Sequence, residues 1–191
     1  MAVGKNKVEF DLRYLYWGTY TVSDAGEVTL GTPARIPGIR KLTRDVNSND
    51  AHLAADDRED YWEDTDENGF TGEFELANLE DALKVQFFKY EVQPDGAIAH
   101  NENLVRPKIY FMFEINGDDH RKRHIVYNTR LGSIGRERNT RDGAKAPDVV
   151  TVPYTTRRDE GTGVTDKSYT PDDAPYDKMF TTPPAPNGAV A

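Results

Sequence analysis

Residues 108–115 read Lys-Ile-Tyr-Phe-Met-Phe-Glu-Ile, and the next four, 116–119, read Asn-Gly-Asp-Asp. Apolar residues recur at every second position of the first stretch, which is the period of one face of a β-strand. That face consists of Ile109, Phe111, Phe113 and Ile115. Asn-Gly is a strong signal for a tight β-turn. We therefore expect residues 121–131, with the alternating run His-Ile-Val-Tyr-Asn at 124–128, to return antiparallel to the first strand.

Further strands are expected on both sides of this hairpin. Residues 8–22 alternate and then become aromatic, which predicts a strand with a bend near Gly18. Turn residues at 23–26 lead into a partner strand at 27–30. The same reasoning predicts strands at 34–36, 70–76, 149–157 and 165–169.

One helix is expected at about 78–88. Asn78 is a suitable N-cap, and the apolar residues that follow recur at spacings of three and four. They are Leu79, Ala82, Leu83 and Phe87. Many short strands with one helix predict a mainly β fold, a β-sandwich or barrel with long loops, rather than an alternating α/β fold.

The chain is expected to form an N-terminal arm at 1–7, a single β domain at 8–180 and a flexible Pro-rich tail at 181–191. Within the domain, the polar run 43–68 predicts an extended loop. Loops of this length without regular structure are uncommon in compact domains and are usually functional or ordered by a partner. Tyr61 and Trp62 are its candidate anchors for assembly contacts.

The composition excludes several classes of function. The formal net charge of −9 disfavours binding to DNA or RNA by phosphate neutralisation. The chain has no cysteine, which excludes disulfides, thiolate zinc sites and thiol catalysis. Residues 1–7 lack the apolar core of a signal peptide, and no run of 18 or more apolar residues predicts a membrane span. We expect a soluble protein made in the cytoplasm.

An EF-hand calcium-loop pattern begins at Asp64 and continues through Asp66 and Asn68 to Glu75 at the twelfth position. An EF-hand needs a helix on each side, whereas this stretch follows a polar run and enters a strand-like segment. A turn within an acidic loop therefore explains the pattern better. Loose calcium binding by these carboxylates is the alternative.

Arg121, Lys122 and Arg123 form a basic patch between His120 and His124. The four histidines are too scattered for a metal site, so a surface contact with an acidic partner is the preferred interpretation. No nucleophile elbow, phosphate loop or helical His-Glu pair occurs. The sequence therefore predicts neither an enzyme nor a cofactor.

Five segments together resemble the phi13-type family of phage major tail proteins. They are Asn-Lys-Val-Glu-Phe-Asp-Leu at 6–12, Gly-Thr-Pro-Ala-Arg-Ile-Pro-Gly at 31–38, Gly-Phe-Thr-Gly-Glu-Phe-Glu-Leu at 69–76, the hairpin at 106–128 and the strand at 149–155. The resemblance covers about residues 6–180. None of the segments is diagnostic alone, and the acidic loop and Pro-rich end depart from the family pattern.

This resemblance implies a tail-tube β-sandwich or barrel that forms hexameric rings, which stack into the tube of a virion tail. Phage DNA would pass through the lumen without specific binding. Other tail proteins would be partners, namely the tape measure, the tail terminator and the baseplate or tip. Assembly would take place in the host bacterial cytoplasm, without a membrane.

Two functional interpretations follow. In the first, the 43–68 segment carries stacking or neighbour contacts between copies of a structural tube subunit. In the second, the chain is a β-sandwich binding module that uses the acidic loop 56–68 for calcium or a basic partner.

Overall fold

The predicted hairpin at 108–131 forms the middle of a large antiparallel sheet. The structure is a computed structural model that describes residues 9–55, 58–101, 105–117, 121–137 and 148–187. Its helix α1 spans Asp81–Phe88. The strands are β1 (Glu9–Val22), β2 (Val28–Leu30), β3 (Ala34–Arg35), β4 (Ile39–Leu42), β5 (Asp45–Ala55), β6 (Arg58–Leu76), β7 (Glu91–Val92), β8 (Ile98–Ala99), β9 (Ile109–Gly117), β10 (Lys122–Leu131), β11 (Gly135–Glu137), β12 (Val149–Thr156) and β13 (Asp166–Tyr169). The mainly β prediction is confirmed.

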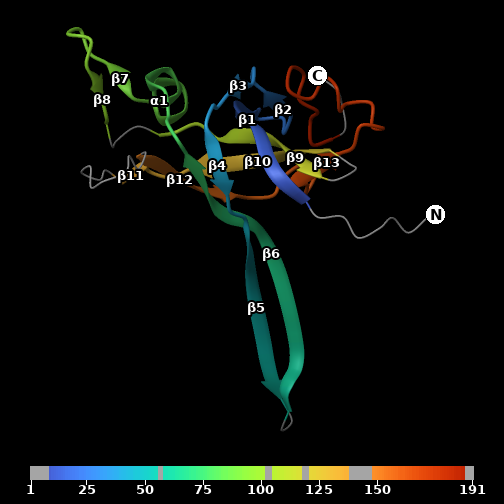
Figure 1. Ribbon diagram of the computed structural model, residues 1–191. Coiled ribbons are helices and arrows are strands. Elements are labelled where there is room, and N and C mark those ends of the chain that lie inside the picture. Colours follow the sequence, from blue (N-terminus) through green and yellow to red (C-terminus); the bar gives the residue numbers. More distant parts are fainter. Residues whose placement is uncertain (1–8, 56–57, 102–104, 118–120, 138–147, 188–191) are drawn as a thin grey trace, which may run out of the picture.

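The main sheet has the strand order β2-β1-β9-β10-β12-β6-β4, with β3, β5, β11 and β13 paired at its sides. Strand β4 lies at the far end of this order and also contacts β1, so the sheet curls around a core (Figure 1). β9 and β10 pair antiparallel, with Ile125 opposite Met112 and Val126 opposite Phe111. The predicted antiparallel pairing is therefore confirmed. The turn expected at Asn116 is wrong, because Asn116 and Gly117 belong to β9 and pair with Phe10 and Glu9 of β1.

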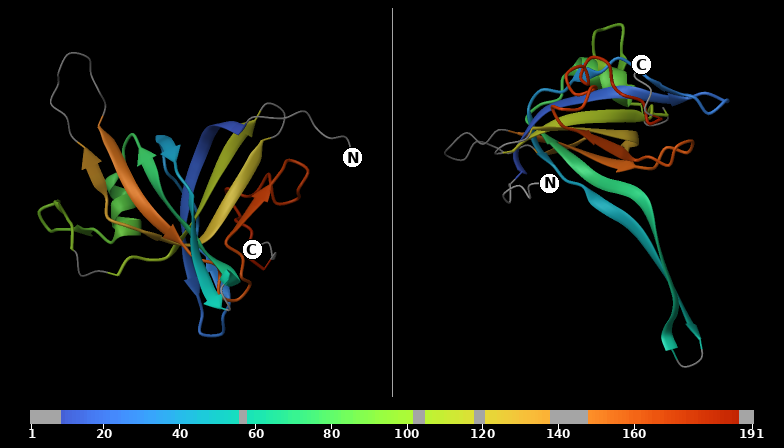
Figure 2. Two further views of the ribbon diagram at one scale, coloured as in Figure 1. Left: turned by 90° about the horizontal axis from the view of Figure 1, so that it is seen from below. Right: turned by 90° about the vertical axis from the view of Figure 1, so that its right-hand side faces the viewer.

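Both faces of β9 are buried, so the two kinds of alternating side chain enter different cores. Ile109, Phe111 and Phe113 belong to the larger cluster, whereas Tyr110 and Met112 belong to a second cluster on the opposite face. A strand that is apolar on both faces must be covered twice. Helix α1 covers one face, and the C-terminal segment covers the other (Figure 2).

Trp17 lies at the centre of the larger core. Its ring is 5.3 Å from that of Phe74 and 5.7 Å from that of Phe87, measured between centroids. Leu79, Leu83 and Phe87 are buried as predicted, but Ala82 is exposed. The helix begins at Asp81 with Glu80 as N-cap, so the proposed cap at Asn78 is wrong. The apolar contact of Leu79 is made by the extended residues before the helix.

The C-terminal segment is packed, which corrects the expectation of a flexible tail over its described residues. Residues 183–186 are buried. The Tyr127 hydroxyl donates to the Pro184 carbonyl at 2.7 Å, and Lys167 Nζ donates to the Ala185 carbonyl at 3.0 Å. Proline lacks a donor but keeps its carbonyl acceptor. A Pro-rich segment can therefore be fixed by donors from a neighbouring sheet.

The bend expected near Gly18 occurs elsewhere in β1. Register shifts separate Phe10 from Leu12 and Arg13 from Tyr16, and the intervening residues Asp11 and Tyr14 have φ angles of 67° and 54°. Gly18 pairs regularly with Tyr110, whose ring would lie 2.3 Å from an added Cβ. Glycine is needed there for close approach rather than for a bend.

The largest correction concerns residues 43–68, which were expected to form a loop. Strands β5 and β6 instead form a long hairpin that extends away from the body of the molecule (Figures 1 and 2). We call residues 45–70 the arm. No helix in the described ranges is long and apolar enough to cross a membrane. The predicted N-terminal arm at 1–7 lies outside the described residues.

Candidate functional site

The arm is a two-stranded ribbon. The ladder runs from Asp45 opposite Thr71 to Ala55 opposite Arg58. β6 also pairs with β12, but this second ladder ends where Thr156 meets Phe70. Beyond Phe70, and within the part of the chain that the structure describes, β5 and β6 pair only with each other. Most of the described part of the arm therefore has no third strand.

A β-bulge lies where the arm leaves the sheet. The ladder passes from Val46 opposite Phe70 to Ser48 opposite Glu67, so β6 contains one extra residue. Gly69 within this bulge has a φ of 82°, and an added Cβ would lie 2.0 Å from the Thr156 carbonyl oxygen. Bulges with a left-handed glycine bend a strand and increase its twist. Gly69 therefore sets the direction in which the arm projects.

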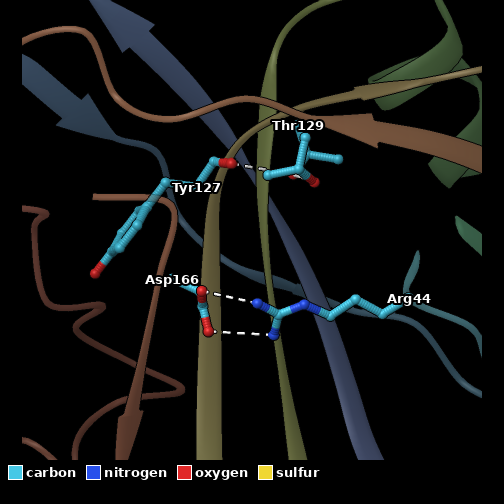
Figure 3. A network of polar contacts seen from close by, with 5 residues as sticks. Arg44, Tyr127, Thr129 and Asp166 are labelled. Carbon is cyan, nitrogen blue, oxygen red and sulfur yellow. Dashed lines mark hydrogen bonds and ion pairs between the residues drawn. The ribbon is translucent and has the colours of Figure 1, made fainter. Parts of the chain in front are cut away.

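An Arg44 clamp holds the other strand at the same place. Its guanidinium donates two parallel hydrogen bonds to Asp166 of β13, at 2.8 and 3.1 Å, near Tyr127 and Thr129 of β10 (Figure 3). The guanidinium carbon also lies 3.5 Å from the centroid of the Phe70 ring. A bidentate pair fixes orientation as well as distance. The clamp thus fixes the β4–β5 junction against β6 and β13.

Tyr154 completes the root of the arm. Its hydroxyl donates to the Thr43 carbonyl at 2.7 Å, and Thr43 exchanges backbone and side-chain hydrogen bonds with Glu73. Burial raises the pKa of Tyr154, so its hydroxyl remains a neutral donor. An added Cβ on Gly72 would lie 2.1 Å from the Thr43 carbonyl oxygen. Glycine at this position permits the close packing of the root.

The charge of the chain is concentrated in the arm. Residues 45–70 contain ten acidic residues and one basic residue, Arg58, so their formal charge of −9 equals that of the whole chain. The remainder holds 23 acidic and 23 basic residues. The body is therefore neutral overall, and the arm is the source of the net negative charge.

The candidate calcium ligands do not form an EF-hand loop. Asp64, Asp66, Asn68 and Glu75 all lie in β6. An extended strand separates its residues 64 and 75 by roughly 36 Å, whereas EF-hand ligands surround one ion. Glu75 is also paired with Arg40 at 3.3 Å. The turn preferred in the sequence interpretation is wrong as well, because the strand continues through the motif.

The anchor candidates Tyr61 and Trp62 lie in the outer part of the arm. Tyr61 is 57% exposed, and Trp62 stands opposite Leu53 in the ladder. An exposed tyrosine at the end of a projecting ribbon is suited to contact another molecule. The prediction that these residues mediate assembly stays a prediction.

The basic patch at 121–123 is not one surface unit. Arg123 pairs with Glu114 at 2.8 Å, and its guanidinium lies between the rings of Tyr176 and Phe180, 4.1 and 4.5 Å from their centroids. It anchors the C-terminal segment. Arg121 is exposed, and Lys122 is half-buried. Arg123 is therefore not available for the predicted contact between this patch and an acidic partner.

A different basic surface lies at the root of the arm. A cleft of about 620 Å³ is lined by four cationic side chains and one acidic residue, Glu160. The cations are Lys108, Arg130, Arg157 and Arg158. Asn68 of β6 forms part of the same lining. The basic cleft gives no signal in the sequence, because its cations come from three segments that only the folded sheet brings together.

No family model matches the chain, and no curated protein matches it.

Proposed function

We propose that the chain is a structural subunit that assembles with copies of itself, and specifically that it is a major tail-tube subunit of a bacteriophage. The observation that carries the proposal is the arm, a two-stranded ribbon whose described strands, beyond Phe70, pair only with each other. Hexameric rings, axial stacking and passage of DNA belong to the proposal through the family resemblance.

The arm has the properties of an element completed by a partner. A two-stranded hairpin alone in water is at best marginally stable, and it leaves the outer edge of each strand unpaired. Ten acidic residues in 45–70 add mutual repulsion. Contact with a neighbouring subunit supplies the missing cover, which supports a role in assembly.

The body has the opposite properties and is suited to serve as a rigid unit. Its sheet is covered on both faces, and its two clusters contain large buried aromatic residues. A self-contained body with a projecting arm is an arrangement in which one subunit reaches the next. Such head-to-tail contacts close into rings or continue as open filaments, according to the rotation between copies.

An arm deletion tests the proposal. Residues 47–68 are replaced by Asn-Gly, which joins Val46 to Gly69 with a short hairpin turn. The matched control shortens the other projecting hairpin, β7–β8, by replacing residues 92–98 with Asn-Gly. Each protein is studied by negative-stain electron microscopy and mass photometry over a range of concentrations.

We expect the full chain and the control to form rings or tubes with a central hole. The armless protein should keep its thermal transition and remain monomeric. Tubes formed by the armless protein would remove the arm from assembly. A full chain that stays monomeric at every concentration would contradict self-assembly.

A further inference from the structure

The four cations of the basic cleft form no ion pair with a carboxylate among the described residues, unlike five cations elsewhere in the body. Arg13, Arg40, Arg44, Lys84 and Arg123 each form an ion pair within the chain. Among the described residues, Lys108, Arg130, Arg157 and Arg158 form none. Arg130, Arg157 and Arg158 are also exposed. The cleft therefore concentrates positive charge that the subunit itself does not neutralise.

Hydrogen bonds with Asn128 fix the backbone that carries two of the cleft arginines. Asn128 is 6% exposed, lies at a register shift in β10 and has a left-handed φ of 44°. Its side-chain amide donates to the Arg158 carbonyl at 2.9 Å, and its own carbonyl accepts from the Arg157 amide at 3.2 Å. Below it, the buried hydroxyls of Thr129 and Thr156 are 3.0 Å apart. The arginine pair is thus presented by an ordered bulge.

The positive charge of the cleft is complementary to the negative charge of the arm. The arm carries a formal charge of −9, and the rest of the chain is neutral. The arm of the same molecule does not fill the cleft, because it leaves the body at Asn68, on the cleft lining, and runs outward (Figures 1 and 2). Nucleic acid is also acidic and could be attracted to a basic cleft, and its binding is an outcome of the test below.

We propose that the basic cleft receives the acidic arm of a second copy of this chain. This inference rests on the proposed assembly function and identifies the surface that accepts the arm. The contact is heterologous, because each copy presents its arm to one neighbour and its cleft to another. The thirteen residues between Phe70 and the tip span roughly 45 Å at the rise of a β-strand. Arm length therefore sets an upper limit on the step between copies.

Charge reversal tests the contact. In Arg157→Glu/Arg158→Glu, two exposed cations become acidic without loss of a described side-chain contact. We expect assembly to need at least about ten-fold more protein, with an unchanged melting temperature. Adding Glu63→Lys and Asp64→Lys to the same chain should restore assembly. The matched control, Lys89→Glu/Lys178→Glu, makes the same charge change at exposed positions outside the cleft and should assemble like the parent chain.

The outcomes separate the two proposals. If the parent chain assembles and Arg157→Glu/Arg158→Glu assembles equally well, the cleft proposal is wrong while the assembly function stands. If the parent does not assemble at all, the assembly function fails. Saturable binding of a DNA duplex that is lost in Arg157→Glu/Arg158→Glu would assign the cleft to nucleic acid and overturn the arm assignment.

A cross-linking experiment decides the contact even when encounters are weak. The chain has no cysteine, so single introduced thiols have no background. A Tyr61→Cys protein mixed with a larger, tagged Thr155→Cys protein should give a mixed disulfide dimer on mild oxidation. Val92→Cys, at an exposed position on the β7–β8 hairpin, is the control partner. Equal yields with Thr155→Cys and Val92→Cys would refute docking at the cleft.

Discussion

The body and the arm use the same secondary structure but differ in what stabilises it. In the body, each face of the β9–β10 pair is buried, by α1 and its aromatic neighbours on one face and by the C-terminal segment on the other. In the arm, two strands hold only each other over most of their length. Backbone pairing alone leaves a two-stranded ribbon marginally stable, whereas the two cores stabilise the strands of the body.

The largest expected difference between the two regions is in amide hydrogen exchange. In dilute monomer, amides of β9 and β10 should exchange only through global unfolding, which costs about 5–15 kcal/mol in ordinary domains. Amides at 48–55 and 58–67 should exchange through local opening, several orders of magnitude faster. Assembly should then protect the arm. Equal protection of both regions in the monomer would erase the distinction.

Core truncation should affect the body far more than the arm. Trp17→Ala removes the ring at the centre of the larger cluster and should lower the free energy of unfolding by about 3–5 kcal/mol in a urea titration. Trp17→Phe should cost less, because it keeps an aromatic ring. Tyr61→Ala, in the arm, should change the monomer by less than about 0.5 kcal/mol. Comparable losses at both sites would mean that the arm belongs to the same cooperative unit.

A pair of glycine substitutions separates backbone strain from the packing of the arm root. Gly26 and Gly69 have nearly the same φ, 83° and 82°, but only Gly69 has atoms where a Cβ would lie. Gly26→Ala should cost about 1 kcal/mol, the usual penalty of a left-handed L-residue. Gly69→Ala should cost about 3 kcal/mol and increase exchange throughout the arm. Equal costs would show that the root adapts to an added methyl group.

Acid should act in opposite directions on the two regions, with the smallest effect of the four. Burial disfavours the charged form of Asp159, but hydrogen bonds from Tyr20 and Thr162 outweigh it and lower its pKa. A carboxyl whose folded pKa is depressed stabilises the fold above its ordinary pKa, about 3.9, and this stability is lost as pH falls toward the folded value. Acid should therefore weaken the body while relieving repulsion among the arm carboxylates.

Urea midpoints measured between pH 7 and pH 3 check this prediction. The Asp159→Asn variant is the control, because it keeps acceptor capacity without a titrating carboxyl. Its midpoint should fall less with acid than that of the parent chain. An identical pH profile in both proteins would contradict the role of Asp159.

The strands of the body could be predicted from the sequence because apolar residues alternate along them. The stretch 108–131 gave the correct pairing, since burial of Ile109 and Phe111 leaves little choice of register. The Asn-Gly signal was misplaced, because Asn116 continues β9 and pairs with β1. The second cluster was missed, because the burial of Tyr110 and Met112 depends on a C-terminal segment whose prolines suggested mobility. The C-terminal segment is held by hydrogen bonds to the backbone carbonyls of Pro184 and Ala185. Every residue has such a carbonyl, so the sequence gives no signal for this contact.

The arm was missed because its sequence lacks a regular alternation of apolar residues. A signal was nevertheless present, since residues 39–68 contain neither Gly nor Pro, the residues that usually punctuate loops. The basic cleft could not have been predicted. Lys108, Arg130 and the 157–158 pair meet only because of the strand order and the bulge at Asn128.

The bulge at Gly69 lies at the sheet edge, where the arm begins. The arm beyond it is roughly 45 Å long at the rise of a β-strand. A change of about 10° in its direction at the bulge would therefore move its far end by about 8 Å. Small angular adjustments at one glycine therefore become large translations at the far end. A change in the packing of this one glycine would therefore redirect the whole arm.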